Sequence, residues 1–264
     1  MTDPGDPRLA DYFELTDPVR RRRREQAEGF FIAESRLVVQ RLLGSGLNVR
    51  SVLVTDAGLS ALARELEGLD APVYVASREL ARVVTGFDVH RGVLAAADRP
   101  APPPVTDLLA RSTTVLVLED IADQVNMGAL FRNGRALGAD AVLLSPHCCD
   151  PLYRRSVRVS MGTVLEVPFA YLEPWPAVLT QLPSAGYVVV ALTPDPGAMG
   201  LEELAVGRAG RRIALLVGAE GPGLSSEVRA GADCQARIPM RAGADSLNVA
   251  TAAALALHAL VAVS

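Results

Sequence analysis

Continuous hydrophobic runs alternate with amphipathic stretches through the C-terminal half of the chain. The hydrophobic runs are typical of strands buried on both faces of a parallel sheet, and they are TVLVLEDI (114–121), AVLLS (141–145), YVVVAL (187–192) and RIALLVG (212–218). The amphipathic stretches predict helices over 127–137, 154–161, 175–185, 225–230 and from 246 to the end. This alternation predicts an α/β fold with a mostly parallel sheet.

The N-terminal half shows the same alternation with shorter segments. Apolar runs predict strands at FFIAES (30–35), VRSVLVT (49–55), VYVA (73–76) and GVLAAA (92–97). Helical patterns lie between them after a basic helical start: one up to Leu43, one over 59–66 and one over 79–84. The pattern predicts a second, smaller α/β domain, again with a mostly parallel sheet.

A proline-rich segment separates the two halves. DRPAPPPV (98–105) contains four prolines in eight residues. Because proline lacks a backbone donor and favours extended geometry, we expect a semi-rigid linker here. The predicted organisation is a small domain over 1–98, a linker over 99–105 and a larger domain over 106–264.

Charge is distributed unevenly along the 264 residues. The net charge of −4 argues against a protein that coats nucleic acid indiscriminately. Arginine nevertheless exceeds the acidic residues in two stretches, 18–50 and 126–160, so a polyanion would meet two local patches. The predicted RNA contacts in these patches are Arg20, Arg21, Arg22, Arg23, Arg24, Arg135, Arg155 and Arg158. The alternative for the run 20–24 is a solvated arm.

Cysteine use and hydropathy limit the location of the protein. Three cysteines, of which Cys148 and Cys149 are adjacent, exclude a disulfide scaffold and suit a reducing compartment. The start of the chain is acidic and contains prolines, unlike a secretory signal. The longest apolar run, 249–263, is too short to span a membrane. We therefore expect a soluble cytoplasmic protein without a membrane partner.

A glycine-rich turn follows the strand predicted at 212–218. GAEGPGLS (218–225) is neither a Walker loop nor a G-x-G-x-x-G fingerprint. Its three glycines allow the backbone to approach a ligand closely, and Glu220 would lie at the carboxyl end of the strand. Open α/β sheets bind ligands at that end. A plain tight turn with a surface glutamate is the alternative.

Two further segments carry polar residues at the start of a predicted helix. In 120–135 the chain passes Asn126 and enters a helix with Arg132 and Arg135 on one face, which suits phosphate binding or a solvated helix face. In 238–260, Ser246 is well placed to cap an Ala/Leu-rich helix. Asn248 lies just inside that helix, where asparagine is a poor helix former and capping or a ligand is needed to explain it.

Together the three segments resemble the signature motifs of the SpoU/TrmH RNA ribose 2′-O-methyltransferases of the SPOUT superfamily. The motifs are N-x-G-x-x-x-R (126–132), G-x-E-G-x-G-L (218–224) and I-P-M…S-L-N-V-A (238–250), in the family's order. Ser-Met-Gly at 160–162 resembles a further family segment. Residues 1–98 resemble the ribosomal-protein-L30e-like substrate-binding domain that precedes the catalytic domain in many members.

The resemblance implies a trefoil-knotted sheet, an exception to unknotted topology, and S-adenosylmethionine as cofactor. It implies that the cofactor is held by Gly218, Ile238 and Leu247, with Thr193 nearby. It also implies a homodimer in which an arginine of one subunit completes the site of the other. The essential family arginine matches Arg132, and the other polar positions of the site match Asn126, Glu220, Ser246 and Asn248.

The chain departs from the family pattern at two places. Asp123-Gln124 stands where the family often has Asp-Pro, and Asn133-Gly134 stands where a small residue and alanine are usual. Neither change touches a polar group that the chemistry needs. Because an arginine guanidinium gives up its proton so reluctantly, our hypothesis is that Arg132 clamps the target phosphate and polarises the hydroxyl.

The resulting expectation is an S-adenosylmethionine-dependent methyltransferase acting on a ribose 2′-hydroxyl of 23S ribosomal RNA. Transfer RNA is the alternative substrate, and a non-catalytic RNA-binding protein of the same fold is the alternative class. The full set of polar site residues argues against a pure binder. A metal protein using 147–150 (His-Cys-Cys-Asp) is disfavoured, because adjacent cysteines do not easily ligate one tetrahedral ion. We expect no metal.

Overall fold

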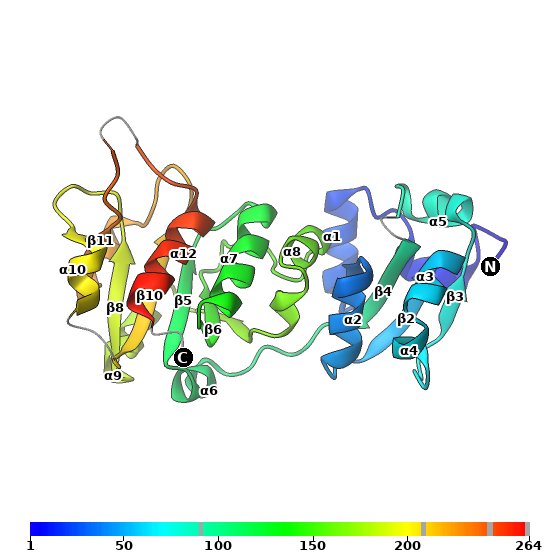
Figure 1. Cartoon of the computed structure of the whole chain (residues 1–264), viewed down its shortest axis with the longest axis horizontal. Helices are drawn as coiled ribbons and strands as arrows, with labels where there is room; N and C mark the ends of the chain where they lie inside the picture. Colours follow the sequence, from blue (N-terminus) through cyan, green and yellow to red (C-terminus); the bar gives the residue numbers. More distant parts are fainter. Residues whose placement is uncertain (90–91, 207–209, 242–244, 262–264) are drawn as a thin grey trace. The chain divides into compact units, whose positions relative to one another are not determined.

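The computed structural model describes residues 1–89, 92–206, 210–241 and 245–261 (Figure 1). The chain divides into two compact units. The first unit comprises 1–101 and 151–165, and the second unit comprises 102–150 and 166–264. Segment 151–165 therefore folds with the N-terminal residues although it lies between strands of the second unit. The predicted domain limits at 99–105 stay a prediction.

The second unit is built on a parallel sheet, as predicted. Its strand order is β7-β6-β5-β10-β8-β11-β9, and every described pairing is parallel. The strands are β5 (Thr114–Glu119), β6 (Ala141–Leu144), β7 (Phe169–Tyr171), β8 (Tyr187–Leu192), β9 (Met199–Gly200), β10 (Arg212–Gly218) and β11 (Cys234–Arg237). The four predicted strands are β5, β6, β8 and β10, at the centre of the sheet. The predicted knot stays a prediction.

Helices cover both faces of this sheet. Val115 and Val117 point into a core that is covered by α6 (Val105–Arg111), η4 (Ala177–Thr180), α9 (Gln181–Ser184) and α11 (Ser226–Ala230). The intervening Leu116 lies against α7 (Gln124–Ala136), which packs beside α12 (Val249–Leu260). The remaining helix, α10 (Leu201–Val206), contacts α12. Burial of a leucine or valine of this kind contributes about 1.5–3 kcal/mol.

The helical segment predicted over 175–185 is present, but it is shorter and divided into two consecutive helices, η4 and α9. Pro176 precedes η4 and Pro183 lies within α9, and neither residue can donate the backbone hydrogen bond that a longer helix requires. No helix among the described residues is long and apolar enough to cross a bilayer.

The first unit has a four-stranded sheet in the order β1-β4-β2-β3. Its strands are β1 (Phe30–Glu34), β2 (Val49–Val54), β3 (Val73–Val75) and β4 (Val93–Asp98). Strand β4 is antiparallel to both β1 and β2, and only β2 and β3 are parallel. The predicted mostly parallel sheet is therefore wrong for this unit. An apolar run reads the same in both directions, so the hydrophobic pattern does not reveal that β4 enters the sheet reversed.

Helices also pack on both faces of this smaller sheet. One face carries a core formed with η1 (Pro7–Tyr12) and α5 (Arg78–Thr85), in which the buried hydroxyl of Tyr12 lies 2.8 Å from that of Ser51. Helix α2 (Arg36–Gly44) contacts β1 and β4. The other elements are α1 (Pro18–Ala27), α3 (Asp56–Ala61), α4 (Ala63–Leu66), α8 (Arg154–Val159) and η3 (Thr163–Leu165).

A buried carboxylate attaches α8 to β1. Glu34 is 1% exposed and accepts hydrogen bonds from Arg154 (2.6 Å) and Arg158 (3.1 Å). Burial lowers the pKa of Arg154, although the charge of Glu34 opposes this shift. The guanidinium of Arg154 also lies over the ring of Phe87, 4.2 Å from its centre. These contacts hold segment 151–165 within the first unit.

Candidate active site

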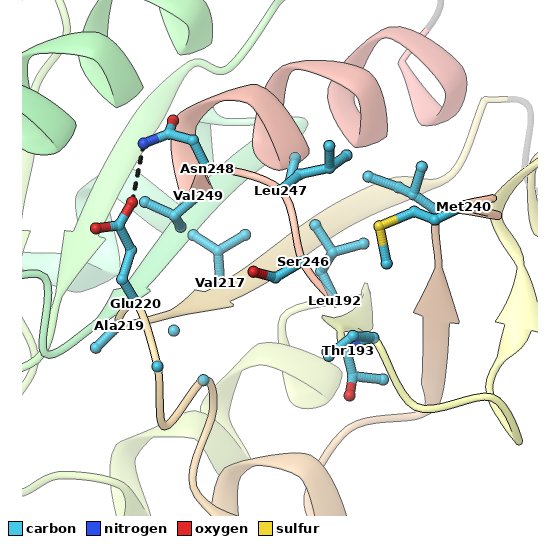
Figure 2. Close-up of a pocket in the computed structure, with 16 residues that line it drawn as sticks. Leu192, Thr193, Val217, Ala219, Glu220, Met240, Ser246, Leu247, Asn248 and Val249 are labelled. Carbon is cyan, nitrogen blue, oxygen red and sulfur yellow. Dashed lines mark hydrogen bonds between the residues drawn. The ribbon is translucent and has the colours of Figure 1, made fainter. Parts of the chain in front are cut away.

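A cavity of about 380 Å³ opens at the carboxyl ends of β8, β10 and β11 (Figure 2). Its volume lies within the range of small-molecule sites, and its position is the one where open α/β sheets bind ligands. All four predicted cofactor residues line it, namely Thr193, Gly218, Ile238 and Leu247. Three of the predicted catalytic residues line it as well, namely Glu220, Ser246 and Asn248.

The lining is largely apolar. Besides Ile238 and Leu247, it includes Leu192, Val217 and Met240, which the motifs did not single out as ligand contacts. Figure 2 shows Glu220 and Asn248 facing each other at one side of the cavity, with Met240 at the opposite side. The cavity therefore combines an apolar body with one polar edge.

Asn248 organises the polar edge. Its side-chain nitrogen donates to Oδ1 of Asn126 (2.8 Å) and to Oε1 of Glu220 (2.9 Å, dashed in Figure 2). Its side-chain oxygen accepts from the backbone nitrogens of Ala250 (3.0 Å) and Thr251 (3.3 Å). One amide thus caps α12 and joins residues from three separate motifs.

Ser246 does not cap the helix, contrary to the prediction. Helix α12 begins at Val249, and Asn248 is its N-cap. Serine and asparagine are about equally good caps, so the choice depends on tertiary contacts. Only Asn248 is fixed by bonds to Asn126 and Glu220, and Ser246 is left exposed on the cavity lining.

The turn after β10 brings two stretches of backbone into close contact. Gly223 donates its backbone nitrogen to the carbonyl of Ala219 (2.9 Å), and Gly221 and Gly223 adopt the left-handed φ values of 88° and 68°. A Cβ atom on Gly218 would lie 2.2 Å from the carbonyl carbon of Gly223. Glycine is therefore required at residue 218 by the packing of the turn.

We expect Gly218→Ala to destabilise the protein by about 1–3 kcal/mol, because the turn must move to admit the methyl group. The same movement distorts the cavity, so binding of S-adenosylmethionine should weaken by about tenfold or more, equivalent to about 1.4 kcal/mol. Thermal unfolding and calorimetric titration would measure both effects.

Gly186→Ala is the control for this substitution. Gly186 has a φ of 83°, so a side chain there strains the backbone and lowers stability, but a Cβ atom would meet no other atom within 4 Å. Gly186 also lies outside the cavity lining, so cofactor binding should not change. Unchanged cofactor binding in Gly218→Ala would contradict the proposed coupling between the turn and the cavity.

Helix α7 places Asn126 at the polar edge but leaves Arg132 away from the cavity. Asp123 caps α7 by accepting from the backbone nitrogens of Val125 and Asn126. Asn126 is buried and reaches Asn248. Arg132, two turns further along, is exposed and does not line the cavity of its own chain.

The departure from the family pattern at Asn133-Gly134 has a packing role that the sequence did not reveal. Asn133 donates its side-chain nitrogen to the carbonyl of Ala250 (2.9 Å), which ties α7 to the first turn of α12. A Cβ on Gly134 would touch Ala139 at 3.4 Å and Leu116 at 3.9 Å, so this residue lies close against the sheet. No local sequence signal identifies the partner of Asn133, because that partner is 117 residues away.

The arginines predicted to contact RNA differ in exposure. Arg20, Arg23, Arg135, Arg155 and Arg158 are exposed, and Arg24 is half-buried. Arg135 and Arg158 are also paired, with Glu166 (3.2 Å) and Glu34. The prediction for Arg21 is corrected, because its side chain is buried and paired with Glu25 and is therefore not accessible to a backbone phosphate. The side chain of Arg22 is not among those that the structure describes.

The metal site that the sequence analysis disfavours has no suitable cluster of ligands in the described part of the chain. His147 lies 3.6 Å from Asp120, but no three His, Cys, Asp or Glu residues there are arranged to hold an ion. Cys148 and Cys149 are buried, and burial raises the pKa of the Cys148 thiol, which donates to the carbonyl of Leu118 (3.3 Å).

Known proteins resemble this chain in both sequence and fold. Residues 113–258 match the SpoU rRNA Methylase family. An uncharacterized tRNA/rRNA methyltransferase of Mycobacterium tuberculosis is 46% identical over 258 residues, which cover 98% of this chain and 90% of the relative. The 23S rRNA (guanosine(2553)-2′-O)-methyltransferase RlmP of Bacillus subtilis is 27% identical and covers 91% of each chain. The crystal structure of an AdoMet-bound rRNA methyltransferase from Sinorhizobium meliloti superposes with a TM-score of 0.83 at 24% identity, covering 98% of this chain and 96% of that chain.

Proposed function

This chain belongs to the SpoU rRNA methylase family of RNA methyltransferases, and we propose that it methylates a ribose 2′-hydroxyl of 23S ribosomal RNA. One observation carries the proposal: residues of three separated motifs meet at one edge of a single cavity. The likeness to RlmP supports the ribose hydroxyl and the 23S substrate. Transfer RNA is the second candidate, since the Mycobacterium tuberculosis relative is named for both RNAs.

The residues of the cavity fit S-adenosylmethionine. Its volume of about 380 Å³ suits a ligand of that size, and its apolar side chains suit an adenine ring. The glycine turn contributes Gly218, Gly221 and Gly223 to the lining, where the absence of side chains lets a ligand approach the backbone, and Thr193 lies on the same lining. We propose Thr193, Gly218, Ile238 and Leu247 as its binding residues. When bound, S-adenosylmethionine supplies an electrophilic methyl group on a sulfonium.

The polar edge is the proposed site of the ribose. Asn248 fixes Asn126 and Glu220 relative to each other, so an incoming hydroxyl meets a preset pattern of donors and acceptors. Ser246 offers a further hydroxyl on the same lining. Holding the hydroxyl in near-attack geometry supplies much of the catalytic effect in a displacement of this kind. With the cofactor bound, these residues would hold the ribose oxygen against the methyl carbon; as the carbon–sulfur bond breaks, the hydroxyl proton would pass to solvent at this exposed edge.

Arg132 is the proposed clamp for the target phosphate. Its guanidinium can hold a phosphate with two parallel hydrogen bonds and stabilise negative charge that develops on the ribose oxygen. Because Arg132 does not line the cavity of its own chain, we propose that it completes the site of a second subunit. The exposed apolar residues Leu247 and Leu255 on or beside α12 support a homodimer.

We further propose that the C-terminal chain threads a trefoil knot around the cavity. Residues 1–98 are the proposed RNA-binding domain, joined to the catalytic domain by the linker 99–105. The cytoplasm is the proposed location, because RNA substrates occur there and three unbridged cysteines suit a reducing compartment.

Transfer of labelled methyl from S-adenosylmethionine to unmodified RNA tests the function. We expect label in 23S ribosomal RNA at one nucleotide that resists alkaline cleavage. If label appeared only in transfer RNA, the proposed substrate would change to transfer RNA and the proposed reaction would stand. Cofactor binding without transfer to naked or partly assembled RNA would contradict the proposed activity.

A further inference from the structure

Helices α1 and α8 meet in the first unit although their sequences are far apart. Figure 1 shows the two helices side by side. The guanidinium of Arg21, on α1, lies over the ring of Tyr153, the N-cap of α8, at 5.1 Å from the ring centre. Arg154 reaches the carbonyl of Leu15, just before α1, at 3.5 Å. Arginines from both of the basic stretches of the sequence are thus brought together at this contact.

The buried arginines form the support of this contact. Arg21 donates through Nε to Glu25 at 2.6 Å, and both residues are almost fully buried. Arg154 is fixed by Glu34 and Phe87. Arg21 is thus paired within α1 and stacked on Tyr153, and Arg154 ties α8 to β1, so both guanidinium groups already have partners inside the first unit.

Several arginines of the two helices are exposed and have weak ionic partners or none. Arg23 and Arg155 are exposed, and no ion pair is formed by either within the described part of the chain. Arg20 is 74% exposed and only loosely approaches Asp17 (3.5 Å) and Glu14 (3.8 Å). Arg158 is half-exposed and shares the single charge of Glu34 with Arg154. An anion is therefore the expected partner of these arginines.

We propose that Arg20, Arg23, Arg155 and Arg158 form one surface, the α1–α8 arginine surface, that binds the sugar–phosphate backbone of the RNA substrate. The proposal rests on the proposed function for the identity of the polyanion. Arginine binds phosphate bidentately, and contacts to phosphates position a folded RNA without reading its sequence. The surface thus contributes to RNA affinity and leaves the chemistry to the cavity.

A charge-matched pair of triple variants tests the location of this surface. The first variant replaces Arg20, Arg23 and Arg155 by Gln. The control variant replaces three exposed arginines of α4 and α5 by Gln, namely Arg64, Arg78 and Arg82. Both variants of the full chain lose the same charge. We expect the first variant to bind 23S RNA fragments about tenfold more weakly. The plot of the logarithm of the binding constant against the logarithm of salt concentration should become shallower by about 2, because each lost phosphate contact lowers its slope by about 0.7–0.9. The control should bind like the unchanged protein.

Kinetics separate this proposal from the proposed function. In the first variant we expect a higher KM for RNA, an unchanged kcat and unchanged binding of S-adenosylmethionine. If RNA binding weakened equally in both variants, only the net charge of the protein would matter, and the proposed α1–α8 arginine surface would be refuted. Unchanged affinity and salt slope in the first variant would overturn it as well, whether or not the unchanged protein transfers methyl groups. Absence of methyl transfer by the unchanged protein, with RNA binding intact, would count against the function alone.

Discussion

Arg132→Ala is expected to lower the rate of methyl transfer by about a thousandfold, the upper range for removal of one charge-stabilising donor. The side chain is exposed and does not line the cavity of its own chain, so neither unfolding temperature nor affinity for S-adenosylmethionine should change. Single-turnover transfer of labelled methyl at saturating RNA, beside thermal unfolding and cofactor titration, measures all three quantities.

Two further substitutions define what Arg132 does. Arg132→Lys keeps the charge but removes the planar fork, so we expect most of the loss to remain. Arg135→Ala removes a neighbouring exposed arginine on the same helix, where the side chain pairs with Glu166, and should retain most of the kcat. Nearly full turnover in Arg132→Lys would refute the bidentate clamp. Mixing Arg132→Ala with a cavity-defective variant such as Gly218→Ala should restore part of the activity if each subunit completes the other.

Asn248→Asp should separate the structural and the catalytic contributions of one side chain. Its carboxylate can still accept from Ala250 and Thr251, so the cap on α12 is kept. It cannot donate to Asn126 and Glu220, and it places a second negative charge beside Glu220. We expect a loss of kcat of about a hundredfold or more with little change in unfolding temperature.

Asn248→Ala provides the comparison. It removes the cap as well as the bridge, and loss of a cap costs about 1 kcal/mol of stability. We therefore expect a similar loss of kcat together with a lower unfolding temperature. Ser246→Ala should leave the unfolding temperature unchanged, because Ser246 does not cap the helix. If Asn248→Asp kept full activity, the bridge to Glu220 would have no role in positioning the ribose.

The central strands of the second unit were predictable because they are buried on both faces. Such strands need an unbroken apolar run, and β5, β6, β8 and β10 each have one. Strands β7 and β9, at the edges of the sheet, contain only three and two residues, which is too short for any pattern to emerge. The direction of β4 in the first unit was not predictable, since it depends on which strands it joins.

The motifs identified the lining of the cavity better than the bonds within it. The resemblance to the family motifs pointed to Glu220 and Asn248, which the structure brings within 2.9 Å. It did not distinguish Ser246 from Asn248 as the cap, because both residue types satisfy that position locally. It also could not reveal that Arg21 is buried, since five consecutive arginines look alike until one of them packs under Tyr153.

The assignment of segment 151–165 to the first unit has a consequence for engineering and for limited digestion. The chain passes between the two units three times, near residues 101, 150 and 165. A protease cut in the proline-rich segment would therefore not release the first unit whole, because 151–165 would stay on the C-terminal fragment while still bound to Glu34 of the other. For the same reason, exchanging the N-terminal unit for that of a relative would require transplanting residues 151–165 with it, so that Glu34 keeps its two arginines.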